Sequence, residues 1–181
     1  MRRLTRRILR ALPVSLALVA AGALVLPVPA PAEDPPAFMH GDFMALNTRG
    51  KAPNTSSDSM RQVYEFDLYS LATGEKIGTA IDDIFCSTTT PPPCQVFDAK
   101  TTFKLPDGEF TNHAQVSVVF DPQRPGWVLV ASLPSSKGII SGSGAYAGRT
   151  GKVILTGVND ATSYPAELGV DDRWVIQFDS K

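Results

Sequence analysis

Two carboxylates and a tyrosine alternate along one short stretch of the chain, a pattern that can support acid–base chemistry. Glu65, Asp67 and Tyr69 occupy every second position of the run from Arg61 to Leu71. Side chains alternate across a β-strand, so these three share one face and the apolar residues between them share the other. In an ordinary sheet the polar face is solvated. In a small barrel the carboxylates can instead line the lumen, where burial would raise their pKa values and make them functional candidates.

A glycine-rich stretch over residues 138–151 holds a second pattern. Part of it matches the G-x-G-x-x-A of dinucleotide sites, which requires a strand that passes into a helix. Glycines after Ala147 break any such helix, and a strand-like run follows, so we expect no nucleotide site. We expect instead a sharp corner built on glycines that allow positive φ angles and close backbone packing. Its structural glycines are Gly142, Gly144, Gly148 and Gly151.

Metal and cofactor signals are weak throughout the chain. His40 and His113 are the only histidines, and neither stands in a cluster with ligand spacing. The G-x-S-x-G elbow of many hydrolases is missing as well. The sequence therefore predicts no metal site and no cofactor.

The two cysteines, Cys86 and Cys94, flank a run of threonines and prolines that cannot be helical. An even pair this close predicts a disulfide in an oxidising compartment. A reactive or metal-binding pair is the alternative, but no third ligand stands nearby.

The first 32 residues have the order of a signal peptide. Five arginines precede an apolar run from Val14 to Val28, and Ala30-Pro31-Ala32 supplies an A-x-A cleavage site. The run is short for a membrane span, which needs about 20 apolar residues. We therefore expect cleavage after Ala32, export through the Sec route with twin-arginine export as an alternative, and no stable membrane anchor.

Removal of this segment changes the charge balance of the chain. Residues 33–181 carry 12 basic and 18 acidic side chains, so the mature domain is acidic. Nucleic-acid binding needs clustered Lys and Arg, which this domain lacks, so we expect no nucleic-acid partner. Its length suits one domain with one core.

Short β-rich runs between turn residues dominate residues 33–181, and helical periodicity is nearly absent. Eight strands are predicted, over residues 38–48, 61–71, 76–86, 95–105, 109–120, 127–133, 152–158 and 173–178. Most of the links are short, which favours an all-β, eight-stranded antiparallel up-and-down barrel of the calycin type with a Gly-rich corner over a β-sandwich. A barrel of this size is filled by side chains or holds one small ligand.

Two stretches resemble a known family. The runs FDLY (residues 66–69) and TGEKIG (residues 73–78) resemble a hairpin of allene oxide cyclases and dirigent proteins. The run ISGSGAYAG (residues 140–148), followed by Gly151, resembles their glycine-rich signature. Strand order and spacing agree over nearly all of residues 33–181, and bacterial spirotetronate cyclases share a similar small barrel.

The resemblance implies a barrel whose lumen binds a hydrophobic small molecule without a cofactor, often as a homodimer or homotrimer. It implies that Asn47 and Asp67 orient or polarise the substrate, with Tyr69 and Glu65 completing a polar patch, while Ala45 and Ile84 stand where the cyclases have Glu and Cys. The predicted function is a secreted, cofactor-independent cyclase or isomerase, or a stereo-directing protein. The alternatives are a non-catalytic binder of a hydrophobic ligand and a structural barrel with a filled interior.

Overall fold

The computed structural model describes residues 39–40, 42–58, 60–86 and 94–180. Residues 1–32, the predicted signal peptide, lie outside this described part. Within it, no helix is long and apolar enough to cross a bilayer.

The described chain consists of strands and one short 3₁₀ turn, η1 (Gly144–Tyr146). The strands are β1 (Met39–His40), β2 (Phe43–Pro53), β3 (Arg61–Ser70), β4 (Lys76–Cys86), β5 (Val96–Leu105), β6 (Gly108–Phe120), β7 (Trp127–Ser132), β8 (Gly138–Gly142), β9 (Gly151–Asp160) and β10 (Glu167–Phe178).

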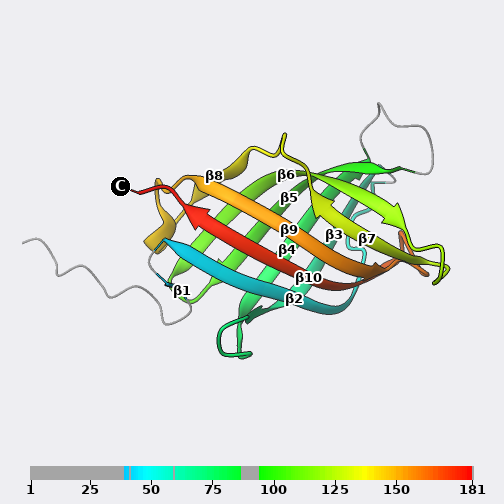
Figure 1. Ribbon diagram of the computed structural model, residues 1–181, viewed down its shortest axis with the longest axis horizontal. Helices are drawn as coiled ribbons and strands as arrows, with labels where there is room; N and C mark the ends of the chain where they lie inside the picture. Colours follow the sequence, from blue (N-terminus) through cyan, green and yellow to red (C-terminus); the bar gives the residue numbers. More distant parts are fainter. Residues whose placement is uncertain (1–38, 41, 59, 87–93, 181) are drawn as a thin grey trace, which may run out of the picture. The chain divides into compact units, whose positions relative to one another are not determined.

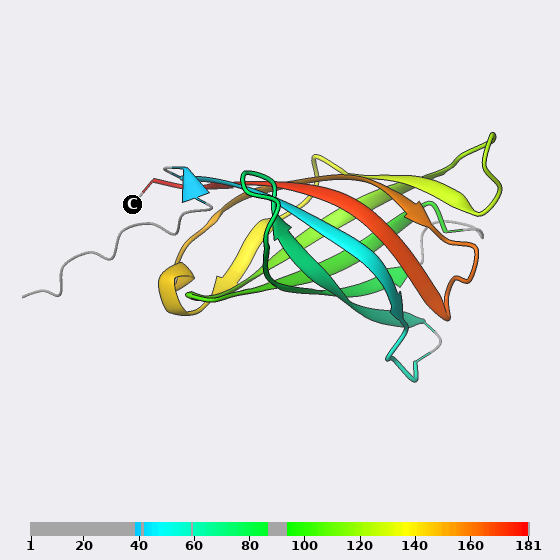
Figure 2. The ribbon, with the colours of Figure 1, turned by 90° about the horizontal axis from the view of Figure 1, so that it is seen from below.

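The sheet closes on itself. Its order is β2-β10-β9-β7-β6-β5-β4-β3, and β3 pairs again with β2, with every pairing antiparallel. Figures 1 and 2 show these strands wrapping around a common interior. The short β8 pairs with β6 beyond the end of β7, so two short strands share one position in the wall. The predicted eight-stranded up-and-down barrel is confirmed.

Strand ends differ from the prediction where loop-forming residues are recruited into the sheet. β2 starts later than predicted because residues 39–40 form the separate strand β1, which pairs with the first residues of β2. β2 also continues through Gly50 to Pro53, because this segment pairs with the first residues of β10 from Glu167 onward. The ammonium of Lys51 also lies 2.8 Å from the carboxylate of Asp160 at the end of β9. Cross-strand pairing outweighs the local turn preference here.

One half of the barrel interior is solid. Phe110 lies at its centre, with its ring centroid 4.8 Å from that of Phe103, 5.1 Å from that of Tyr146 and 5.6 Å from that of Phe178. Trp174 adds an edge-to-face contact with Phe103 at 5.1 Å. All five rings are fully or almost fully buried. Such packing of large apolar side chains is a main source of folding free energy.

The glycine-rich corner closes this solid end. η1 directs the side chain of Tyr146 into the aromatic cluster, where its hydroxyl donates to both carboxylate oxygens of Asp107, 3.0 and 3.1 Å away. Gly144 has a φ of +59° and packs against the backbone of Asp107, where a Cβ would collide. The corner therefore needs a glycine at this position for two separate reasons.

The predicted disulfide is present. Cys86, the last residue of β4, is bonded to Cys94, which lies just before β5. Both lie at the end of the barrel opposite the aromatic cluster, and the chain between them, residues 87–93, is outside the described part. A bond of this kind is typical of proteins from oxidising compartments.

Removal of this disulfide is expected to cost about 2–3 kcal/mol, because the bond restricts a short loop in the unfolded chain. The double variant Cys86→Ser/Cys94→Ser, unfolded in urea, should show that loss against the wild-type protein. Reductant should lower the stability of the wild type to that of the variant and leave the variant unchanged. Equal wild-type stability with and without reductant would contradict the expectation.

Candidate functional site

The other half of the barrel is hollow. It contains a cavity of about 360 Å³, a size typical of small-molecule sites. Most of the lining is apolar, and Trp174 separates the cavity from the aromatic cluster. Trp174 is held by a hydrogen bond of 3.1 Å from its indole nitrogen Nε1 to the hydroxyl of Thr48. The apolar lining comes mainly from Ile84, Phe97, Ala99, Val116, Val118, Val128, Val130, Leu155, Leu168 and Trp174.

The link between β9 and β10 contributes to the cavity wall at the hollow end. The Tyr164 hydroxyl donates to Oε1 of Gln62 at 2.8 Å, and its ring lies edge-on to that of Phe97. The Tyr64 hydroxyl donates to the carbonyl of Pro165, also at 2.8 Å. These contacts tie the link to β3 and β5 at the end where the cavity lies.

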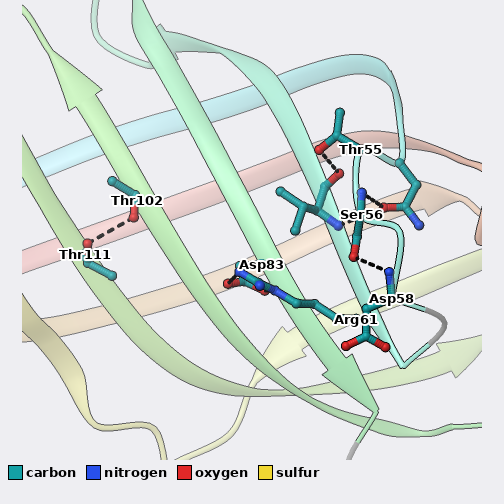
Figure 3. A network of polar contacts seen from close by, with 9 residues as sticks. Thr55, Ser56, Asp58, Arg61, Asp83, Thr102 and Thr111 are labelled. Atoms are coloured by element: carbon teal, nitrogen blue, oxygen red, sulfur yellow. Dashed lines mark hydrogen bonds and ion pairs between the residues drawn. The ribbon is translucent and has the colours of Figure 1, made fainter.

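A tandem pair of aspartates on β4 shows which side chains point inward. Asp83 lies on the outer wall, where its two oxygens accept hydrogen bonds of 2.7 and 2.6 Å from the guanidinium of Arg61 (Figure 3). Because side chains alternate along a strand, Asp82 points into the lumen, where it is buried and lines the cavity.

Asp82 begins a row of inward polar groups on three adjacent strands. It is the cross-strand partner of Thr101, which in turn is the partner of Asn112. Their outward neighbours Thr102 and Thr111 bond to each other on the outer wall at 3.0 Å (Figure 3). Inside, Oδ1 of Asp82, Oγ1 of Thr101 and both amide atoms of Asn112 are buried without a hydrogen-bond partner. Unpaired buried polar atoms cost free energy, so a ligand or an ordered water that bonds to Asp82 and Thr101, the two members of the row that line the cavity, would be favoured.

A second carboxyl enters the cavity from β10. Asp172 is 2% exposed and packs against Gly157, where any Cβ would overlap with its Oδ1. With its amide nitrogen turned toward Asp172, Asn159 donates to that Oδ1 at 2.8 Å. The glycine leaves room for the carboxyl, and the asparagine fixes its orientation.

Burial raises the pKa of both carboxyls, and repulsion by other carboxylates adds to the rise at Asp172. Loss of hydration raises the pKa of Asp82 to about 6. The pKa of Asp172 is raised well above its usual range by burial, and further by the negative charges of Asp82 and Asp171. Two interacting acids titrate as a pair, and the neutral form of one is favoured while the other is charged.

The lumen offers oxygen and amide groups but little for a metal. In the described part of the chain, no three His, Cys, Asp or Glu side chains are arranged to hold a metal ion. The cavity lining that the structure describes also contains no Lys, Arg or His. What these residues offer directly is acid–base and hydrogen-bonding chemistry.

The residues singled out by the sequence lie elsewhere. Asn47, Asp67 and Tyr69 come together on the outer wall, and Glu65 is exposed on the same face. The Tyr69 hydroxyl is 3.4 Å from Asp67, whose carboxylate also lies 2.6 Å from the ammonium of Lys76. The hypothesis that Glu65 and Asp67 line the lumen is therefore wrong, because the alternate residues of β3 fill the interior. A chemical role for the four residues stays a prediction.

Asn47 nevertheless touches the strand that carries the inner carboxyl. Its amide nitrogen donates to the backbone carbonyl of Asp172 and to Oδ1 of Asp171, both at 2.8 Å. Asn47 thus stabilises β10 by hydrogen bonds made outside the lumen.

Asp82 and Asp172 were missed by the sequence reasoning, although a signal exists for both. Each belongs to an Asp-Asp pair inside a strand, and alternation sends one member of such a pair inward. The pattern does not say which member, and only strand register decides it.

Comparisons with known proteins do not establish a family. No protein-family model matches the chain, and no curated protein matches it. A solved structure described as a pyocyanin demethylase is similar at a TM-score of 0.42 and 18% identity, over 76% of this chain and 99% of that chain. A similarity at this level assigns neither family nor activity.

Proposed function

We propose that the barrel binds a small, largely apolar molecule in its lumen and moves a proton on it without a cofactor. In this proposal Asp82 is the base and Asp172 is the acid. The protein would then be an isomerase or cyclase of the proton-transfer type, as the resemblance to cyclases implies.

The observation that carries the proposal is a carboxylate oxygen, Oδ1 of Asp82, which is buried without a hydrogen-bond partner in an apolar cavity. Oδ1 of Asp82 and Oγ1 of Thr101 are buried, unpaired and part of the cavity lining. A structural carboxyl would be expected to have hydrogen-bond partners, as Asp172 has in Asn159. A ligand with a hydrogen-bond donor would satisfy Oδ1 of Asp82.

The proposed reaction needs one shared proton. Ionised Asp82 accepts a proton from a weakly acidic C–H bond of the ligand, and neutral Asp172 donates its own proton to another atom of the same molecule. The ligand leaves as an isomer, and the proton on Asp82 returns to Asp172 directly or through water. Neighbouring acids whose pKa values are raised to different extents suit this division of roles.

Only two features of the proposal come from the resemblance to allene oxide cyclases and dirigent proteins: the barrel and a ligand bound in its lumen. Export of residues 33–181, and assembly into a homodimer or homotrimer, are further parts of the proposal. The disulfide supports the first of these.

Binding is tested with N-phenyl-1-naphthylamine, a neutral dye whose fluorescence rises in apolar surroundings. The wild-type protein should bind it, and Ala99→Phe should weaken binding by about 10-fold or more, because Ala99 is buried and lines the cavity. Ala131→Phe, the same change on a residue of β7 outside the cavity lining, should leave binding unchanged. Thermal unfolding of each variant checks that it is folded.

The outcomes separate the possible roles of the barrel. No dye binding, or equal binding by Ala99→Phe, would overturn a ligand site in the lumen. Dye binding without any proton transfer that depends on Asp82 would leave a non-catalytic binder.

A further inference from the structure

The described lining of the lumen contains acidic side chains but no basic ones. Two carboxyls, Asp82 and Asp172, belong to its lining, and the described lining contains no cationic side chain. Any anionic group entering this space would lose its hydration and face a carboxylate with no counter-charge. A cation entering it would find an acceptor instead.

The two unpaired oxygens of the cavity lining, on Asp82 and Thr101, can both accept a hydrogen bond from a ligand. Oδ1 of Asp82 accepts hydrogen bonds when ionised, and Oγ1 of Thr101 can accept one as well. An ammonium group carries three donors and no acceptor, so it can serve both oxygens at once. A carboxylate ligand has only acceptors, so it could not donate a hydrogen bond to Asp82.

Aromatic rings line the same space. Trp174, Phe97 and Tyr164 all contribute to the cavity wall. Faces of aromatic rings attract cations, most strongly where water is excluded, and they also pack well against flat apolar molecules.

We propose that the lumen takes a small aromatic or apolar molecule bearing a single positive nitrogen, placed against Asp82 and Thr101, and that it rejects carboxylate and phosphate ligands. This inference rests on the proposed function, since it names the substrate class of the same site. One positive charge balances an ionised Asp82 beside a neutral Asp172.

Three probes of nearly equal shape test the charge preference. 1-Naphthylmethylamine, 1-naphthalenemethanol and 1-naphthoic acid differ mainly in the charge of one substituent at neutral pH. Isothermal titration with the wild-type protein should give the tightest binding for the amine, weaker binding for the alcohol, and binding of the acid about 10-fold or more below that of the amine.

The tandem aspartates supply matched variants. Asp82→Asn/Asp172→Asn should reduce amine affinity to that of the alcohol. Asp83→Asn/Asp171→Asn removes the same formal charge at the adjacent residues and should keep the amine preference, because Asp83 is paired with Arg61 on the outer wall and neither residue belongs to the cavity lining. The wild-type series needs no variant and decides the question by itself if the inner double variant does not fold.

The results separate this inference from the proposed function. If the alcohol binds but the amine is not preferred over the acid, charge selection is overturned and the lumen site stands. If none of the three probes binds and the neutral dye does not bind either, both proposals fail.

Discussion

Asp82→Asn is expected to make the barrel more stable and to remove its chemistry. At neutral pH the variant should gain about 2–3 kcal/mol in free energy of unfolding, because a buried carboxyl whose pKa is raised to about 6 must be charged there at a cost. Proton transfer should fall by about 100-fold or more, as expected on loss of a general base. Stability and activity would move in opposite directions.

The pH dependence follows from the direction of the shift. The native state holds the proton of Asp82 to higher pH than the unfolded chain does, so its contribution to stability is complete below about pH 4. That contribution is lost as pH rises through about pH 6, and the effect of Asp82 on stability is constant once the carboxyl is ionised in both states. The gain of the asparagine variant should therefore be present at neutral pH and vanish at about pH 4 or below. Asp172, whose pKa is also raised, gives the same direction of pH dependence in both proteins, and its share is smaller in the variant, which lacks the charge of Asp82.

Urea unfolding at a series of pH values measures the stability. Conversion of 3-cyclohexenone to 2-cyclohexenone, followed by ultraviolet absorbance, is a probe reaction for a proton shift between two carbons. Asp83→Asn is the control, since it loses only an outer-wall ion pair with Arg61 and should cost no more than about 1 kcal/mol. A destabilised Asp82→Asn at neutral pH would show that Asp82 is structural.

Phe110→Ala is expected to cost about 3–5 kcal/mol, the largest loss of stability predicted for this chain. Phe110 is fully buried and touches Phe103, Tyr146 and Phe178, so its removal opens a hole in the middle of the aromatic cluster. The neighbouring rings belong to different strands and to η1, which limits their ability to close that hole.

Phe43→Ala is the matched control for this change. Phe43 stands at the start of β2 with 51% of its surface exposed, so the same truncation should cost less than about 1 kcal/mol. Both variants are compared with the wild type in urea at one pH. Equal losses for Phe110 and Phe43 would contradict the assignment of the solid half as the main source of stability.

Much of this fold could be predicted because its signals are local. Alternation along β3, the turn residues at Pro106-Asp107-Gly108 and the spacing of strands point to a closed antiparallel sheet. β8 was missed since its residues read as a corner, and their pairing with β6 depends on contacts far away in sequence. The late start of β2 is local, because residues 39–40 form the separate strand β1 that pairs with the first residues of β2.

The site was harder to predict than the fold. The sequence pointed to the polar face of β3, which is the outer wall, while the inner polar row is formed by single residues from several strands. Asp82 and Thr101 become neighbours only through the register of β4 against β5. Asp172 reaches the lumen because Gly157 leaves space beside it, a relation between two strands that no local pattern contains.

The separation of the barrel into a solid and a hollow half has a consequence for how such a protein can diversify. Phe110 and the three rings packed around it do not line the cavity, whereas the cavity lining and the apolar core share Ala99, Val116, Val128, Val130, Leu155 and Trp174. Substitutions of the polar lining residues, or conservative changes among the apolar ones, can therefore change the preferred ligand while the aromatic cluster is kept. Descendants of one ancestral sequence could acquire different small-molecule specificities without passing through unfolded intermediates.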